Sequence, residues 1–403
     1  MEPAPLAPSP SAAWLDRLLG GAVAEGVVDL HLEPDRAGLW VRRRGAGGWE
    51  EERVPATIAG PELVARIKVL AHLDPNERRL PLDGRLRWSG GTQTADFRVA
   101  TLPALHGEVV ALRVLQRSAV PPALSSLGLS SAAEERLRSW LAQGRGLVAI
   151  AGPTGAGKTT TAYAALGCVD ATQRKIMTVE DPVEFQRDGF VQIAVDAEQG
   201  LTFADALRSL LRQDPDLIFV GEVRDAATAA VAVQAALTGH GVVATVHAAS
   251  TEGAIIRLLD LGVEPFLLAD ALAGVVAQRL VARLCPVCRV PAPWPRDLGP
   301  SPDGVVSGAE RSGAMTRGPG CAACAGRGVV GRVGFFEVIA VTRAIREAMV
   351  RVDGLEALRE AMAAEVAVER GGGLRAQLLE AACRGEIDVN DACTGMGDAD
   401  DGG

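Results

Sequence analysis

An eight-residue run from Gly152 to Thr159, GPTGAGKT, constrains the possible fold more than any other feature of the chain. It matches the pattern GxxxxGK[ST] in full and lies between the apolar stretch GLVAIAG and the helix-forming stretch TTTAYAAL. In such a loop the glycines let backbone N–H groups surround phosphates, Lys158 reaches the β and γ oxygens, and the Thr159 hydroxyl binds Mg²⁺. The N-terminus of the following helix adds its dipole. The sequence therefore predicts an ATP site that comprises Gly152, Pro153, Thr154, Gly155, Ala156, Gly157, Lys158, Thr159 and Thr160.

An acidic residue follows an apolar strand candidate about sixty residues downstream of this loop. The strand candidate spans 217–220, and Glu222 comes just after it, whereas Asp216 precedes it. A carboxylate at the end of a strand beside a phosphate loop can polarise the attacking water or hold the Mg²⁺ shell. We therefore expect Glu222 rather than Asp216 to be catalytic. The alternative is an ordinary carboxylate at a strand end.

A second acidic group, Glu180, Asp181 and Glu184, lies between these two motifs in the run TVEDPVE. Three acids within five residues repel one another unless a metal ion or a cation offsets their charge. With a phosphate loop upstream, we expect this cluster to lie near the bound metal ion. A solvated turn is the alternative.

Two of the five histidines, His240 and His247, bracket the next strand candidate in a Thr/Gly-rich setting. Such groups can sense a γ-phosphate by hydrogen bonding, as switch elements do. A structural role is the alternative for either histidine.

Four of the seven cysteines form two CxxC pairs, Cys285/Cys288 and Cys321/Cys324. Each pair offers two thiolates to one ion, and together they predict a tetrahedral Cys₄ zinc site. The segment between the pairs has few core-forming residues, so a metal ion would supply what its core lacks. A redox-active pair is the alternative.

Length and composition indicate a globular chain of two or three domains. The chain has 403 residues, of which 48% are hydrophobic and 23% charged, a balance that supports sizeable cores. The net charge is −9, and the first 117 residues carry 15 basic and 15 acidic side chains, so the acidic excess lies in the remainder. We expect no nucleic-acid partner because no basic block is present. No window suits a membrane span or a signal peptide, so a cytoplasmic location is expected.

The order of patterns along the chain gives the expected domains. We expect residues 1–20 and the acidic tail 395–403 to be disordered, 21–117 to form an α+β domain, and 118–130 to be a linker. Strand candidates in the α+β domain begin near residues 27, 38, 85, 95 and 108, with a helix over 61–73. Strand and helix patterns alternate from the phosphate loop to about residue 284, which predicts a parallel α/β sheet. This α/β domain spans 131–394, with the cysteine insert at 285–324 and a helical part at 340–394.

Polar side chains of the first domain leave two possibilities open. Asp29, His31 and Glu33 alternate with apolar residues, so one strand face carries all three, and a solvated face is one explanation. A role at a nucleotide is the other, and Arg78, Arg79, Arg85 and Arg98 are the arginines that can reach one.

Taken in order, these motifs resemble the secretion ATPase family of type II secretion, type IV pilus assembly and DNA uptake, related to GspE and PilB. The resemblance covers roughly residues 28–392. It rests on the phosphate loop, TVEDPVE, DPDLIFVGEVRD, TGHGVVATVH and the run GAIIRLLDLGVEPFLLADALAGVVAQRLVARLCPVC. It implies a RecA-like P-loop domain with a Cys₄ zinc insert, preceded by a smaller PAS-like α+β domain. The insert is typical of assembly motors rather than retraction motors.

The resemblance also implies a role for several residues. It implies that Glu222 activates water, that Glu180 and Glu184 lie near the metal ion, and that His247 lies near the γ-phosphate. Arg208, Arg212 and Arg224 stand where the family keeps arginines, and some arginines of the first domain are expected to neutralise phosphate charge. The family usually has His-Thr-Asn where this chain has His247-Ala248-Ala249, which removes two hydrogen-bonding side chains.

For the assembly, the resemblance implies a cytoplasmic homo-hexamer, peripheral at the inner membrane, that uses ATP, Mg²⁺ and Zn²⁺. Its expected partner is an inner-membrane platform protein of the GspF/PilC kind, and its work is the assembly of pilin-like subunits or protein secretion. One alternative function is a weakly hydrolytic regulatory or scaffold subunit. Another is a DNA-uptake motor of the same family.

Overall fold

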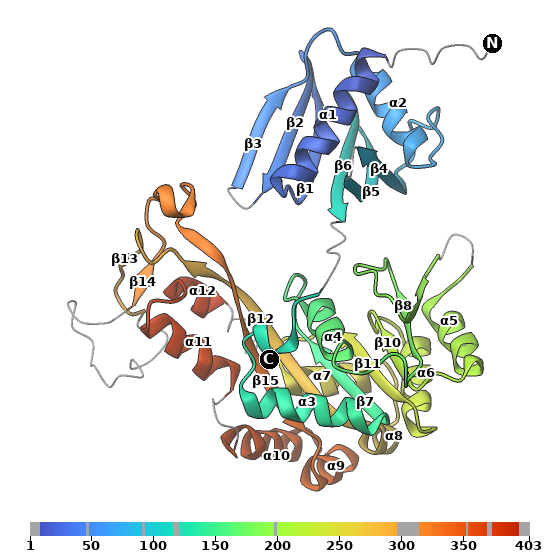
Figure 1. Cartoon of the computed structure of the whole chain (residues 1–403), viewed down its shortest axis with the longest axis vertical. Helices are drawn as coiled ribbons and strands as arrows, with labels where there is room; N and C mark the ends of the chain where they lie inside the picture. The colour runs from blue at the N-terminus through green and yellow to red at the C-terminus, as the bar shows by residue number, and fades with distance from the viewer. Residues whose placement is uncertain are drawn as a thin grey trace. The chain divides into compact units, whose positions relative to one another are not determined.

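The computed structural model describes residues 9–45, 48–90, 93–115, 121–196, 200–295, 314–351, 354–368 and 373–394 (Figure 1). The chain divides into two compact units, Met1–Ser118 and Ala119–Gly403. The first unit has one hydrophobic core, and the second has two large clusters and a smaller one. The expected disorder of residues 1–8 and 395–403 lies outside the described residues.

The first unit is built on a six-stranded antiparallel sheet in the order β3-β2-β1-β6-β5-β4. Alternate residues of the central strands, among them Leu30, Leu32, Val110 and Leu112, are buried in the core, as a sheet with one covered face requires. Five of the strands and one helix match the predictions, and β3 was not predicted. The elements are β1 (Asp29–Asp35), β2 (Gly38–Gly45), β3 (Gly48–Arg53), β4 (Leu82–Gly90), β5 (Gln93–Ala104), β6 (Gly107–Leu115), α1 (Pro10–Glu25) and α2 (Gly60–Leu70).

The prediction of disorder over residues 1–20 is wrong from residue 10 onward, where α1 begins. Ser9 caps this helix by accepting a hydrogen bond from the Ala12 N–H at 3.2 Å, and a proline at the first helical position is compatible with the helix. Leu15 and Leu19 are 1% exposed and pack in the core of the first unit. The proline- and alanine-rich start concealed an apolar stripe at helical spacing.

The second unit is built on a seven-stranded sheet in the order β15-β12-β7-β11-β10-β8-β9. All neighbouring pairs are parallel except β12 with β15, so the predicted α/β class is confirmed. The strands are β7 (Gly146–Ala151), β8 (Ile176–Glu180), β9 (Phe190–Ala194), β10 (Leu217–Val220), β11 (Gly241–Val246), β12 (Leu272–Leu284) and β15 (Val329–Ala340).

Helices cover both faces of this sheet, as Figure 1 shows. Along β7, Leu147 and Ala149 belong to one core cluster and Val148 and Ile150 to the other, because successive side chains of a strand point to opposite faces. The first cluster contains residues of α5 (Phe203–Leu210), α6 (Ala226–Leu237), α7 (Thr251–Asp260) and α8 (Pro265–Ala271). The second contains residues of α3 (Ser131–Gln143) and α4 (Lys158–Leu166).

The prediction of a linker over residues 118–130 is wrong for its second half. A short 3₁₀ turn, Leu124–Ser126, belongs to the second unit, and Leu124 is 1% exposed among residues of α3 and α4. The two prolines at 121 and 122 prevent a helix there, but they do not prevent the next apolar side chain from being buried.

The strands β12 and β15 form a long antiparallel ribbon that extends from the sheet toward the cysteine pairs (Figure 1). Beyond it lie the short pair β13 (Val290–Pro291) and β14 (Met315–Thr316). The predicted C-terminal helices are α9 (Arg343–Val350), α10 (Gly354–Val368), α11 (Leu374–Cys383) and α12 (Val389–Thr394). Among the described residues, no helix combines the length and the apolar character needed to cross a bilayer.

Candidate active site

The phosphate loop joins the end of β7 to the start of α4, as its sequence predicts. Gly155 and Gly157 have φ of 80° and 85°, a left-handed conformation that side chains other than glycine rarely adopt. The Lys158 ammonium donates hydrogen bonds to the carbonyl oxygens of Gly152 and Pro153 at 2.6 and 3.0 Å. Burial lowers the pKa of Lys158, while the nearby carboxylates of Glu222 and Glu184 oppose that shift. Lys158 is thus held in the loop and faces the predicted acids.

A cavity of about 460 Å³ opens beside the loop. It forms at the carboxyl ends of β7, β8, β10 and β11, which meet at one edge because these strands are parallel. Its lining includes seven residues of the predicted loop, from Thr154 to Thr160, together with the predicted acids. Residues that line it are Thr154, Gly155, Ala156, Gly157, Lys158, Thr159, Thr160, Glu180, Asp181, Pro182, Glu184, Phe203, Gly221, Glu222, Arg224, Thr245, Leu280 and Arg332.

Glu180 ends β8 and is 1% exposed. Its Oε1 atom accepts hydrogen bonds from the Tyr163 hydroxyl at 2.5 Å and the Thr178 hydroxyl at 2.6 Å. Its Oε2 atom is buried without a hydrogen-bond partner among the described residues. Burial raises the pKa of Glu180, and the two hydroxyl donors only partly oppose it. An unpaired, buried carboxylate oxygen that lines a cavity suits a cation or a water bound to one.

Glu184 lies on the same wall, four residues along the chain. Burial raises the pKa of Glu184, whereas a hydrogen bond from the Thr159 side chain and the charge of Lys158 lower it. Thr159, the predicted Mg²⁺ ligand, therefore lies beside Glu184 in the cavity lining. Glu180 is buried in the cavity wall, which excludes a solvated turn for this residue, whereas Glu184 lines the cavity and is exposed to solvent.

Glu222 follows β10 and points into the cavity, where its Oε2 atom accepts a hydrogen bond from Arg224 Nε at 2.7 Å. Its side chain is 26% exposed, and that of Arg224 is 58% exposed. Asp216 lies at the opposite end of β10, where its Oδ2 accepts a hydrogen bond from the Lys175 backbone N–H at 2.7 Å. Of the two acids that flank β10, Glu222 lines the cavity and Asp216 does not.

The two histidines do not join this group. His247 lies just beyond β11 and is exposed, and it is not among the described residues that line the cavity. His240 precedes β11, at the opposite edge of the sheet, and its Nδ1 lies 3.0 Å from the Ala235 carbonyl oxygen. The structural explanation therefore holds for His240. The residue of the histidine motif that lines the cavity is Thr245. Its hydroxyl donates a hydrogen bond to the Gly221 carbonyl oxygen.

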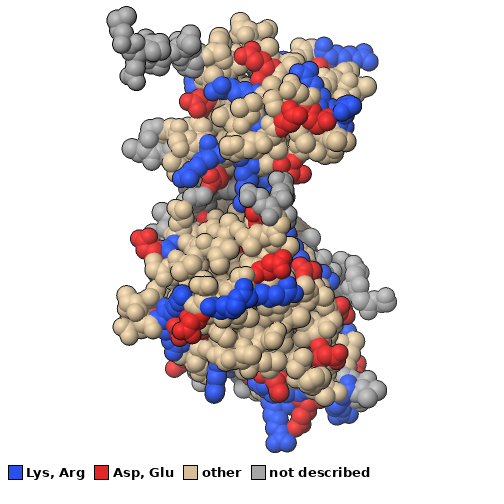
Figure 2. Space-filling model, turned by 90° about the vertical axis from the view of Figure 1, so that its right-hand side faces the viewer, with Lys and Arg blue, Asp and Glu red and all other residues tan. Residues whose placement is uncertain are grey.

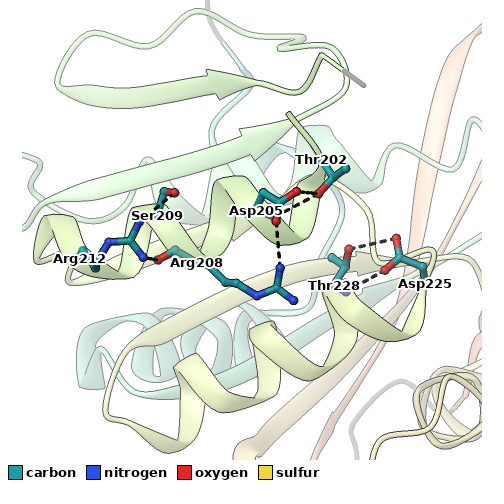
Figure 3. Close-up of polar contacts among 7 residues, drawn as sticks. All are labelled: Thr202, Asp205, Arg208, Ser209, Arg212, Asp225 and Thr228. Atoms are coloured by element: carbon teal, nitrogen blue, oxygen red, sulfur yellow. Dashed lines mark hydrogen bonds and ion pairs between the residues drawn. The ribbon is translucent and has the colours of Figure 1, made fainter. Parts of the chain in front are cut away.

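Two further arginines, Arg208 and Arg212, lie on the outer face of α5 and the turn after it, away from the cavity lining. Arg208 Nη1 donates to Asp205 Oδ1 at 3.0 Å, and Arg212 donates to the Arg208 carbonyl oxygen and the Ser209 hydroxyl (Figure 3). Figure 2 shows acidic side chains beside basic ones on the visible face of both units.

In the first unit, the polar face of β1 contacts arginines of its own sheet. Asp29 Oδ1 accepts a hydrogen bond from Arg113 Nε at 2.8 Å, and Asp29 Oδ2 pairs with Arg44 at 2.6 Å. Burial by itself raises the pKa of Asp29, but the two arginines outweigh it and lower this pKa below its ordinary value. Arg85 and Arg98 stand opposite each other on β4 and β5.

Sequence reasoning missed the contribution of the β12–β15 ribbon to the cavity. Leu280 of β12 and Arg332 of β15 both line it, and Gln278 of β12 contacts the phosphate loop. Gln278 is 122 positions from its loop partner Ala156, and Leu280 and Arg332 lie farther along the chain. The motif pattern carries no signal for them, because their approach depends on the pairing of β12 with β7.

The four cysteines of the two CxxC pairs lie together at the end of the ribbon. Their sulfur atoms all lie within 4.8 Å of one another, and three sulfur pairs are 3.8 Å apart. Four sulfur ligands placed tetrahedrally at about 2.3 Å from an ion are about 3.8 Å apart, so the cluster fits a metal ion. Burial by itself raises the pKa of the Cys324 thiol. The backbone N–H groups of Cys321 and Gly328 donate to its sulfur and lower that pKa to about 6.

Comparison with known proteins places the chain in a family. Residues 7–389 match the family described as Type II/IV secretion system protein. The chain is 39% identical to the type II secretion system ATPase E of Vibrio cholerae, over 91% of this chain and 72% of that protein. It is 43% identical to the type II secretion system protein E of Klebsiella pneumoniae, over 85% of this chain and 68% of that protein.

Solved structures show the same fold at lower identity. The Legionella pneumophila ATPase DotB gives a TM-score of 0.66 with 19% identity and 99% coverage of both chains. The pilus retraction motor PilT with bound ADP gives 0.63 with 23% identity, covering 94% of this chain and 96% of that one. Membership of this family implies ATP and Mg²⁺ at the site. The chain therefore belongs to the Type II/IV secretion system protein family and is a secretion ATPase.

Proposed function

We propose that the cavity beside the phosphate loop converts ATP and water to ADP and phosphate, with Glu222 orienting the attacking water. The observation that carries this assignment is that Glu222 and Lys158 face the same cavity and interact through their charges. Lys158 would exchange its loop carbonyls for phosphate oxygens when ATP binds. Arg224, hydrogen-bonded to Glu222, would hold that carboxylate in place and then respond to the charge of the transferred phosphate.

The acids on β8 and the loop after it complete the proposed site. Thr159 and the carboxylates of Glu180 and Glu184 would hold Mg²⁺ directly or through its water shell. Bound Mg²⁺ would neutralise part of the charge on the phosphate oxygens. We further assign His247 to the γ-phosphate, a role that requires the exposed ring to turn toward the cavity when ATP binds.

For the cysteine cluster, we propose zinc as the ion. Four thiolates without an oxygen or nitrogen ligand suit Zn²⁺, and a closed set of four suits a structural site. Cys285, Cys288, Cys321 and Cys324 would then stabilise the end of the ribbon rather than take part in hydrolysis.

At the level of the machine, we propose a cytoplasmic homo-hexamer that drives pilin-like assembly or protein secretion. Its docking partner would be a platform protein in the inner membrane, and closure of subunits on ATP would move that partner. The relatives named for type II secretion support this assignment. Addition of DNA should leave turnover unchanged; DNA-stimulated turnover would favour the DNA-uptake alternative.

The first prediction tests the role of Glu222. Glu222→Gln should keep ATP affinity and lower kcat by about 10²- to 10⁴-fold, the range that a positioned general base supplies. Phosphate release and ATP binding would be measured on the purified full-length assembly. Asp216→Asn is the matched control, because it alters an acid at the other end of β10 and should leave kcat unchanged. Near-normal turnover by Glu222→Gln would refute the assignment.

A second candidate function, a weakly hydrolytic regulatory subunit, is favoured by one observation. His247 is exposed and is followed by Ala248 and Ala249, so this end of β11 offers few hydrogen bonds to a nucleotide. Under this alternative the wild-type assembly binds ATP and releases almost no phosphate, and Glu222→Gln makes no further difference.

A further inference from the structure

Gln278 is a buried polar residue beside the phosphate loop that the roles assigned so far leave unused. It belongs to β12, which pairs in parallel with β7 up to Ala277 opposite Ala151. Gln278 is therefore the next residue of β12 after the pairing ends, at the point where β7 gives way to the loop. Its side chain is almost fully buried, with 2% of the residue exposed.

The amide of Gln278 holds one peptide group of the loop. Its Nε2 atom donates a hydrogen bond to the Ala156 carbonyl oxygen at 2.5 Å. A carbonyl oxygen only accepts hydrogen bonds, so the nitrogen of the amide must face it. Ala156 lies between Gly155 and Gly157, which both have positive φ. Because glycines allow many backbone conformations, this hydrogen bond fixes the orientation of a peptide that its neighbours leave free.

The start of the loop also packs tightly against Gln278. A Cβ atom placed on Gly152 would lie 3.0 Å from the Gln278 carbonyl oxygen and 2.9 Å from the Ala156 Cβ. The same carbonyl oxygen accepts a hydrogen bond from Arg279 Nη1 at 3.2 Å. The loop thus lies against a backbone that is itself hydrogen-bonded, with no room for a side chain at Gly152.

The other end of the amide has no partner. The Oε1 atom of Gln278 is buried and has no hydrogen-bond partner among the described residues. A buried polar atom without a partner destabilises the folded chain. An apolar residue of the same length would remove that penalty, so stability alone does not explain glutamine at this position, and the need for its N–H donor does.

We propose that Gln278 is a positioning residue for ATP binding, which fixes the phosphate loop through the Ala156 carbonyl without touching the phosphates itself. The inference deepens the proposed function and rests on ATP binding at this loop. It connects the β12–β15 ribbon to the nucleotide through one hydrogen bond. Loss of the donor leaves the Ala156 carbonyl unsatisfied, and the loop relaxes toward solvent to hydrate it.

The test compares two variants of the full-length chain. Gln278→Met keeps the length of the side chain and removes the donor, so KM and Kd for ATP should rise about tenfold, the effect of one net hydrogen bond. We expect kcat to change less than about threefold, because the catalytic carboxylate lies on another strand. Val275→Ala, a buried residue three positions earlier on β12, is the control: it should lower Tm and leave KM for ATP unchanged.

Each outcome decides between explanations. A larger KM and Kd for Gln278→Met with little change in Tm supports the positioning role. An unchanged Kd for Gln278→Met refutes it, and so does an equal rise in KM for Val275→Ala, which would mean that any loss of packing on β12 has the same effect. If the wild-type chain bound no ATP, the proposed function would fail first, independently of Gln278.

Discussion

The Glu180 carboxyl combines two opposing properties: it is buried beside two hydroxyl donors, and one of its oxygens has no partner among the described residues. Burial raises the pKa of Glu180. The folded chain therefore favours the protonated form, and the ionised form opposes folding as the pH rises above the ordinary carboxyl range. At neutral pH this residue lowers stability, which is typical of a group kept for function.

We predict that Glu180→Gln stabilises the second unit at neutral pH and impairs turnover. The amide keeps an oxygen for Tyr163 and Thr178 and removes the buried charge, so the free energy of unfolding should rise by about 1–3 kcal/mol. The gain should shrink as the pH falls from the raised pKa of folded Glu180 toward the ordinary carboxyl pKa, and it should be absent below that value, where the wild-type residue is protonated in both states. Unfolding in urea without nucleotide, repeated across pH, measures it.

Glu222→Gln is the control for this experiment, because Glu222 is partly exposed and paired with Arg224. It should show no comparable pH-dependent gain. A Glu180→Gln chain that is less stable than wild type at every pH would contradict the prediction. It would mean that Glu180 is charged and paired in a way that Gln cannot replace.

At the scale of elements, the cysteine cluster is the end of the β12–β15 ribbon, and we predict that its metal ion stabilises that end. Cys285→Ser should lower the bound zinc to well below one per chain and increase amide hydrogen exchange in β12 near Leu284 and at the start of β15. Metal binding supplies the stability that a small segment lacks. Elemental analysis and hydrogen-exchange mass spectrometry measure the two effects.

Cys168→Ser is the matched control, since the Cys168 thiol lies outside the cluster and donates to the Ala164 carbonyl oxygen at 3.3 Å. Its metal content and exchange should equal those of the wild type. Absence of metal from the wild-type chain would refute the zinc assignment.

Helices and strands were predictable from the sequence where several neighbouring residue patterns indicate the same element. The phosphate loop combines an apolar strand, glycines and a helix start, and its pattern gives both the fold and the position of Lys158. The acid at Glu222 was predictable for the same reason, because the ends of parallel strands meet at one edge. By contrast, α1 begins in a Pro/Ala-rich stretch and depends on burial against a sheet whose strands lie far along the chain.

Other parts depended on tertiary contacts that leave no local pattern. Apart from Gly48 and Trp49, β3 consists of charged residues. It is held by its ladder with β2 and by ion pairs such as Arg42 with Glu51 and Arg43 with Glu52. The exposed position of His247 could not be read from its motif. Gln278 contacts the phosphate loop and Arg332 lines the cavity only because the chain returns to β7 after about 120 residues.

At the scale of the whole molecule, the two units have separate cores, and we predict that the second folds without the first. Residues 119–403 produced alone should unfold cooperatively and bind ATP, because the phosphate loop, the acids and the ribbon all belong to this unit. Calorimetry with and without ATP would measure this, since a ligand of the folded state raises its Tm. A fragment without a cooperative transition would show that its core requires the first unit.

The ribbon that carries the cysteines also has a mechanical consequence. Cys285 lies seven residues beyond Gln278, a distance of about 23 Å along a strand that rises about 3.3 Å per residue. The paired register of β12 and β15 prevents either strand from sliding past the other. A rotation of the ribbon by about 10° at Gln278 would displace the cysteine end by about 4 Å, because displacement grows with the distance from the point of rotation. A small change of orientation beside the nucleotide cavity would thus become a larger displacement at the cysteine end of the ribbon.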